Sequence, residues 1–92
     1  MPASRAATMS NVAASASSVA LFTEQHGASN RSVQNDSAAT LYLKFGATAS
    51  TTSYTVLVPP GAYYEFPRPA YDGTVHGIWS SATGSARLTE VS

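Results

Sequence analysis

The stretch ATLYLKFGATASTTSYTVLVPPGAYYEFP, residues 39–67, decides the fold class of this chain. Residues 40–46 and 53–59 alternate large apolar side chains with polar ones, which is the pattern of strands that bury one face. Glycine, proline and serine residues end each of these runs after a few positions. The stretch therefore predicts short antiparallel strands joined by turns.

The same period of two continues on both sides of this stretch, and no segment repeats apolar residues at helical spacing. The predicted strands are residues 17–25, 31–36, 40–46, 53–59, 62–67, 75–81 and 86–91. We expect an all-β chain: a small antiparallel β-sandwich or flattened barrel of about seven short strands. The sandwich domain should cover residues 17–92, and an extended, flexible N-terminal arm should cover residues 1–16.

Three segments carry turn chemistry. Pro60 and Gly61 suit the two central positions of a turn, because proline presets φ and glycine accepts a positive φ. The sequences YDGT (71–74) and ATGS (82–85) each contain glycine and are predicted as hairpin turns. The predicted core is Leu21, Val33, Leu41, Leu43, Phe45, Tyr54, Val56, Val58, Phe66, Val75, Trp79 and Leu88.

The composition limits the class of partner. The 92 residues include five basic and five acidic side chains, and only 11% are charged. A neutral chain lacks the basic face that binds nucleic acid or an anionic membrane. A surface poor in Lys and Glu is typical of protein interfaces, and it indicates a subunit of an assembly. The chain has no cysteine, which favours assembly in a reducing cytoplasm or stabilisation by oligomerisation.

The N-terminal segment differs from the rest of the chain. Seven of its first 20 residues are Ala and five are Ser, so it can bury little apolar surface. It lacks the Leu-rich core of a signal peptide, and no window of the chain has the 18 or so apolar residues of a transmembrane helix. We expect an arm that becomes ordered against a neighbouring subunit.

The reactive side chains form no catalytic or metal-binding motif. Asp72, His76 and a serine could in principle make a triad, but the chain has no nucleophile elbow and no oxyanion motif. His26 and His76 lie fifty residues apart without metal-site spacing, even with Asp36 or Asp72 added. The expectation is a protein that is not an enzyme and has no cofactor and no metal. NRS (30–32) and NDS (35–37) match a glycosylation pattern by accident.

The aromatic side chains are the most informative feature outside the core. Tyr63 and Tyr64 are neighbours in a predicted strand, so their side chains point to opposite faces. An exposed tyrosine in this proline-rich segment suits a protein interface, or a stacking platform for a sugar. The residues predicted for a protein interface are Arg5, Met9, Val12, Tyr63, Tyr64, Arg68 and Tyr71.

Five motifs resemble small structural proteins of tailed bacteriophages, and with the upstream stretch ASASSVALFTEQHGASNRSVQ the resemblance covers about residues 13–92. They are N-D-S-x-x-x-L-Y-L-K-x-G (35–46), S-Y-T-V (53–56), P-G-x-Y-Y-E-x-P (60–67), Y-x-G-x-x-x-G-I-W (71–79) and A-T-G-S-A-R-x-T-E (82–90). The resemblance implies a β-rich, non-enzymatic component of the virion.

Within that group we expect a capsid decoration, or cement, protein on the exterior of the virion, assembled in the host bacterial cytoplasm. Its partner is then the major capsid protein, whose subunits it bridges. Such proteins are often trimers at local three-fold positions, so a homotrimer is the first expectation. A neck, tail or baseplate component is the first alternative. A carbohydrate-binding module that uses Tyr63, Tyr64 or Tyr71 is the second.

Overall fold

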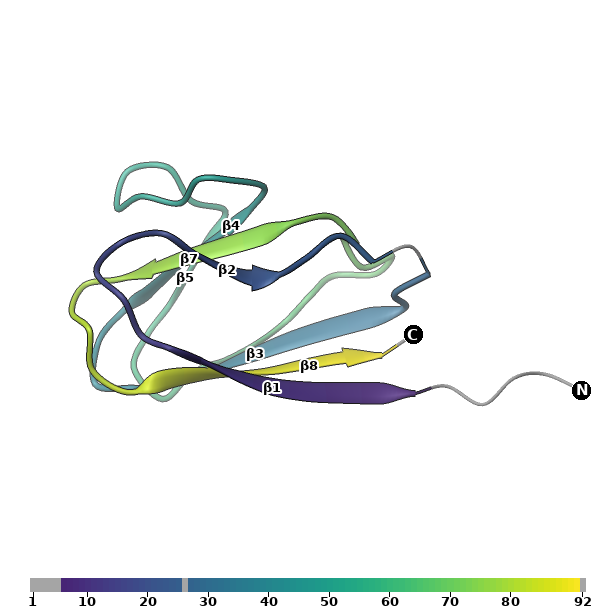
Figure 1. Ribbon diagram of the computed structural model, residues 1–92, viewed down its shortest axis with the longest axis horizontal. Coiled ribbons are helices and arrows are strands. Elements are labelled where there is room, and N and C mark those ends of the chain that lie inside the picture. Colours follow the sequence, from purple (N-terminus) through teal and green to yellow (C-terminus); the bar gives the residue numbers. More distant parts are fainter. Residues whose placement is uncertain (1–5, 26, 92) are drawn as a thin grey trace, which may run out of the picture.

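The computed structural model describes residues 6–25 and 27–91, which form eight β-strands and no helix. The strands are β1 (Ala7–Ala13), β2 (Val19–Phe22), β3 (Asn30–Asp36), β4 (Leu41–Phe45), β5 (Val56–Val58), β6 (Tyr63–Glu65), β7 (Val75–Trp79) and β8 (Ser85–Val91). They make two four-stranded sheets that face each other (Figure 1). The first sheet has the order β1-β8-β3-β6, and the second has the order β2-β7-β4-β5.

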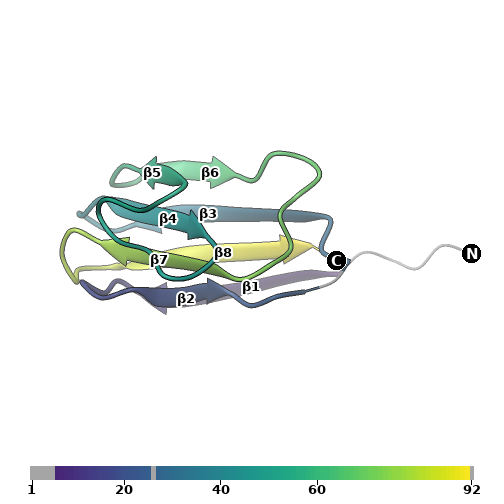
Figure 2. The same ribbon diagram turned by 90° about the horizontal axis from the view of Figure 1, so that it is seen from above.

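The pairing of the strands is nested. β1 pairs with β8, β2 with β7, β3 with β6 and β4 with β5, all antiparallel, so the chain resembles one long ribbon folded at the β4–β5 hairpin. Rolling up this ribbon adds the β3–β8 and β4–β7 pairs and gives the two sheets. Figure 2 shows the result: β1 and β2 lie at one edge, and β5 and β6 lie at the other. This arrangement is a jelly roll, and it confirms the predicted antiparallel sandwich.

All seven predicted strands are present, but two of the predicted hairpin turns are connections between the two sheets. Residues 71–74 end the connection from β6 to β7, and residues 82–84 end the connection from β7 to β8, which begins at Ser85. In both cases the two strands belong to different sheets. Neither segment is therefore a hairpin turn. The turn at Gly61 is confirmed: its φ is 75°, and the amide of Ala62 donates to the carbonyl of Pro59 at 3.0 Å.

The structure adds an eighth strand inside the segment expected to be an arm. β1 pairs with β8 without interruption from Ala7↔Val91 to Ala13↔Ser85. Residues 7–13 therefore belong to the sandwich and need no neighbouring subunit to order them. The sequence signal was weak because only Val12 among the side chains of β1 is partly buried. Residues 1–5 lie outside the described residues.

The core lies between the two sheets and agrees with the predicted one at most positions. Phe45 and Val56 are only partly buried against it, whereas Tyr54 is 41% exposed, so the prediction was wrong for Tyr54. Tyr54 precedes β5 in the chain and does not share the alternation of that strand. Phe22 is buried next to Leu21 because a register shift interrupts the β2–β7 pairing between Ala20 and Phe22.

A buried arginine joins the two sheets at one end of the sandwich. Arg31 in β3 is fully buried, and its Nε donates to Glu90 Oε2 at 2.7 Å. Its two terminal nitrogens donate to four backbone carbonyls, those of Thr23, Tyr71, Asp72 and Gly73. The guanidinium also lies 4.7 Å from the ring centre of Phe22. Arg31 thus fixes the connections that leave β2 and enter β7.

A buried amide joins the two sheets at the other end of the sandwich. Asn35 is fully buried, and its Nδ2 donates to the carbonyls of Ala39, Val58 and Pro59. Its Oδ1 accepts from the indole of Trp79 at 3.1 Å and from Ser37. Every buried side-chain N or O atom of the described residues has a partner, as buried polar groups require.

Candidate interaction surfaces

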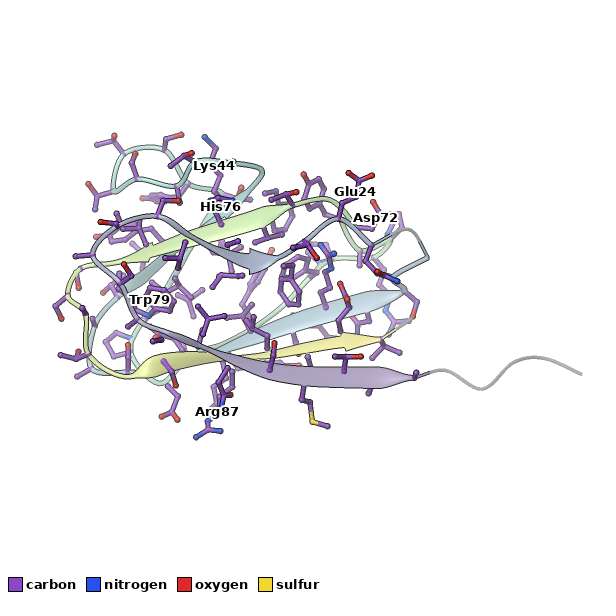
Figure 3. All side chains as sticks on the ribbon, viewed as in Figure 1. Glu24, Lys44, Asp72, His76, Trp79 and Arg87 are labelled. Atoms are coloured by element: carbon purple, nitrogen blue, oxygen red, sulfur yellow. The ribbon has the colours of Figure 1, made fainter. Side chains whose placement is uncertain are left out.

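The residues considered for catalysis do not form a triad, because Asp72 lies apart from His76. Figure 3 shows His76 on the second sheet and Asp72 at the far end of the sandwich. His76 Nδ1 lies 3.1 Å from Ser18 Oγ, but this hydroxyl also accepts the amide of Ala49 at 3.0 Å. The pair therefore anchors the 47–53 loop to the strands beneath it. Within residues 6–25 and 27–91 there is no pocket in which a substrate could lie.

The described residues among those considered for a metal site, Asp36, Asp72 and His76, form no metal-binding cluster. His26 lies outside the described residues. Asp36 accepts from Arg87 Nε at 2.8 Å on the outer surface of the first sheet, away from His76 on the second. Among the described residues no three His, Cys, Asp or Glu side chains come close enough to hold a metal ion. The outer surfaces of the sandwich are therefore the parts to consider for binding.

The outer face of the second sheet carries an apolar patch. Leu57 and Ile78 flank Tyr42 in neighbouring strands, and the ring of Tyr54 lies edge-on to Tyr42 with the ring centres 5.0 Å apart. We call these four residues the Tyr42 patch. Tyr54 and Leu57 are 41% and 42% exposed, whereas Tyr42 and Ile78 are half-buried. A contiguous group of this kind on the outside of a sandwich is typical of a binding surface.

A cation, Lys44, lies beside the Tyr42 patch, and its neighbours hold it in place. Lys44 is paired with His76 across β4 and β7. Its Nζ donates to Ser53 Oγ at 2.8 Å and to the carbonyl of Thr48 at 3.3 Å. Figure 3 shows Lys44 extending toward the loop that rises above this sheet. Lys44 therefore holds the 48–53 segment beside the patch.

The outer face of the first sheet is more polar. Met9 is 74% exposed and Tyr63 is 62% exposed, but they lie on the two opposite edge strands. Between them the outer face presents Gln34 and the exposed Arg87–Asp36 ion pair. Figure 3 shows Arg87 pointing away from the core. The predicted interface residues Met9 and Tyr63 therefore lie on the same face of the sandwich but do not form one patch.

The other predicted interface residues are scattered. Val12 and Tyr64 pack against the core, because they alternate with the outward-facing residues of β1 and β6. Arg68 is exposed in the loop after β6, and Arg5 lies outside the described residues. Tyr71 is 37% exposed, and one face of its ring stacks on Phe45 with the ring centres 4.9 Å apart.

Sequence reasoning missed the Tyr42 patch for an identifiable reason. Tyr42 alternates with the core residues Leu41 and Leu43, so its side chain lies on the outer face of the sheet. The same alternation places the Leu57 side chain on the outer face, since Val56 and Val58 face inward. The alternation does not tell which strands are neighbours. The pairing of β4 with β5 and with β7 is what brings Tyr42, Leu57 and Ile78 into one row.

Comparisons with family models, with curated proteins and with solved structures gave no match to this chain. The described residues contain no helix that could cross a membrane. The function of the chain is therefore inferred from its own surfaces and motifs.

Proposed function

We propose that this chain is a structural protein of a tailed-bacteriophage virion, specifically a capsid decoration protein on the exterior of the head. The observation that carries the proposal is the Tyr42 patch, an apolar group on the outside of a small sandwich of low charge. The phage-like motifs over residues 35–90 support it. The jelly roll is a fold used by viral capsid proteins among others, so it agrees with the proposal at the level of fold only.

The proposed mechanism is surface complementarity. Each copy lays the Tyr42 patch on the major capsid protein and covers the joint between neighbouring subunits. The apolar area buried across this joint opposes the outward pressure of the packaged DNA, at roughly 25 cal/mol for each Å² buried. The polar side chains of the first sheet, Gln34 and Arg87 among them, then face the solvent.

The proposal includes self-association on the shell. A trimer at local three-fold positions is the arrangement that the resemblance implies. Closed symmetry suits a small sandwich because each copy gains buried area from its neighbours.

The test is binding of the purified chain to capsid shells that lack decoration. Leu57→Glu places a charge in the Tyr42 patch and should weaken binding about tenfold or more, because a buried unpaired charge opposes association. Gln34→Glu is the matched control, since it adds the same charge to the outer face of the first sheet, where residue 34 is exposed. It should bind as the unchanged protein does.

Two results would contradict the proposal. Binding that is lost with Gln34→Glu and kept with Leu57→Glu would mean that the first sheet faces the shell. A copy number of six, twelve or fifteen per particle, in place of hundreds, would assign the chain to the neck or tail. A saturable glycan signal that Tyr63→Ala abolishes would favour the carbohydrate-binding alternative, since Tyr63 is the most exposed of the three tyrosines considered for it.

A further inference from the structure

The four edge strands of the sandwich are not equally protected. β5 and β6 have only three residues each, and prolines follow both of them. β2 has four residues and contains the register shift between Ala20 and Phe22. Short length, proline and bulges are the usual means by which edge strands avoid pairing with other chains.

β1 has none of these protections. It has seven residues, ATMSNVA, with no charge and no proline, and its pairing with β8 is continuous. Every side chain of β1 is exposed except that of Val12, which is half-buried. Figure 2 shows β1 at the edge of the first sheet, extending beyond the shorter β2 of the second. β1 is thus a long, neutral edge strand without a bulge.

The direction of the free backbone groups follows from the hydrogen bonds at the end of this pairing. The amide of Ala14 donates to the carbonyl of Gly84 at 3.0 Å, so residue 14 faces β8. In an antiparallel pair the residues that face the partner alternate with those that face away. The N–H and C=O groups of Ala7, Met9, Asn11 and Ala13 therefore point away from β8, and no described residue lies on that side of β1.

We propose that this edge binds the β1 strand of a second copy of the chain, antiparallel, around a two-fold axis at Ser10. In this register Met9 lies opposite Asn11 of the other copy, and Ala7 lies opposite Ala13. These are the residues whose backbone groups point outward, so each exchanges two hydrogen bonds with its opposite residue. The two first sheets then form one continuous eight-stranded sheet.

The side chains of β1 suit a second copy. A strand without charge does not repel its own copy, and it offers no charge by which a different partner would be selected. Between the hydrogen-bonded pairs, Thr8 lies opposite Val12 of the other copy, which brings two β-branched side chains together. The small residues at both ends leave room for the opposite strand. Copies held close together on a shell would pair more readily, because their effective concentration is high.

The contact is isologous, so in free solution it produces a dimer, and it can be measured without any capsid. One pair of strands buries less area than a stable interface, so the dimer should be weak and form between about 10 µM and 1 mM. Sedimentation velocity of the full chain over this range should show a monomer–dimer equilibrium. A chain that is monomeric throughout the range, or one that forms trimers, would overturn the proposal.

Asn11→Pro tests the edge itself. Proline removes an N–H that points away from β8, so the β1–β8 pairing keeps its hydrogen bonds, and an edge position accepts proline. Both copies carry the substitution, so the dimer loses two hydrogen bonds. Its dissociation constant should rise about tenfold or more. An unchanged urea midpoint, followed by the fluorescence of the buried Trp79, verifies that the monomer is intact. Dimerisation at unchanged strength in this variant would refute the pairing.

Two double variants test the register, and both contain Asn11→Glu. With Met9→Glu, position 9 places a like charge opposite position 11 of the other copy, and the dimer should be lost. With Met9→Lys, the two positions carry opposite charges, and the dimer should form at least as well as in the unchanged chain. Equal dimerisation of the two variants would exclude this register. Because no capsid is present, a failure here leaves the proposed binding of the Tyr42 patch to the shell untouched, and the reverse also holds.

Discussion

Replacing Arg31 by methionine tests the buried arginine at one end of the sandwich. Methionine has a similar length and fills much of the same space, but it donates no hydrogen bond. The change leaves the carboxylate of Glu90 without its ion-pair partner and leaves the backbone carbonyls around the guanidinium without donors. The Glu90 side chain is 21% exposed, so water can reach it and compensate in part.

The expected loss is large relative to the stability of the domain. Removing one partner of a buried, hydrogen-bonded ion pair costs about 3–5 kcal/mol. The hydrogen bonds to the carbonyls are part of one network, so their contributions are not added separately. At the usual stability per residue, a domain of this size has a free energy of unfolding of about 5–14 kcal/mol. Arg31→Met should therefore remove a substantial fraction of the stability.

Arg87→Met is the matched control, because it is the same substitution at an exposed ion pair of the first sheet. The Arg87 Nε lies 2.8 Å from Asp36 Oδ2, much as Arg31 lies 2.7 Å from Glu90, but the two side chains are 58% and 52% exposed. Exposed pairs of this kind contribute about 0–1 kcal/mol. The measurement is urea unfolding of both variants, followed by the fluorescence of Trp79, the only tryptophan.

The reasoning would be refuted if the two variants lost stability equally, within about 1 kcal/mol, at an unchanged dependence on urea. Burial, and not the length of the salt bridge, is what distinguishes Arg31 from Arg87. A large loss for Arg87→Met alone would reverse this order and point to an interaction on the outer face that the single chain does not contain.

Two further substitutions probe the core and the second polar centre. In Gly77→Ala the added Cβ would lie 2.8 Å from Leu21 Cδ1 and 2.9 Å from Leu41 Cδ1, so overpacking should cost about 1–3 kcal/mol in urea unfolding. Leu21→Ala in the same chain should remove part of that penalty, and strictly additive losses would contradict the proposed clash. Asn35→Asp replaces the amide that donates to three carbonyls with a carboxylate, and it should lower the free energy of unfolding by about 3 kcal/mol or more. Gln34→Glu, the same change at the exposed neighbouring residue, should alter stability by less than about 0.5 kcal/mol; equal effects at 34 and 35 would show that burial is not the cause.

The strands themselves could be predicted because each carries its own signal. Leu41 and Leu43 alternate with Tyr42 and Lys44, and a period of two needs no knowledge of the neighbouring strand. The turn at Gly61 was predictable for the same local reason, since its positive φ suits glycine. β1 was missed because its inward-facing residues Thr8 and Ser10 are polar and remain exposed.

The sequence of this chain by itself determined that it folds as strands and which side of most strands faces the core, because both depend on residues next to one another. Only the tertiary structure decided that the connections at 71–74 and 82–85 cross between sheets, since hairpins and crossovers use similar turn residues. It also decided that Arg31 and Asn35 are buried. Their partners lie up to 59 residues away in the chain, and a polar side chain becomes a core residue only where the fold brings those partners to it.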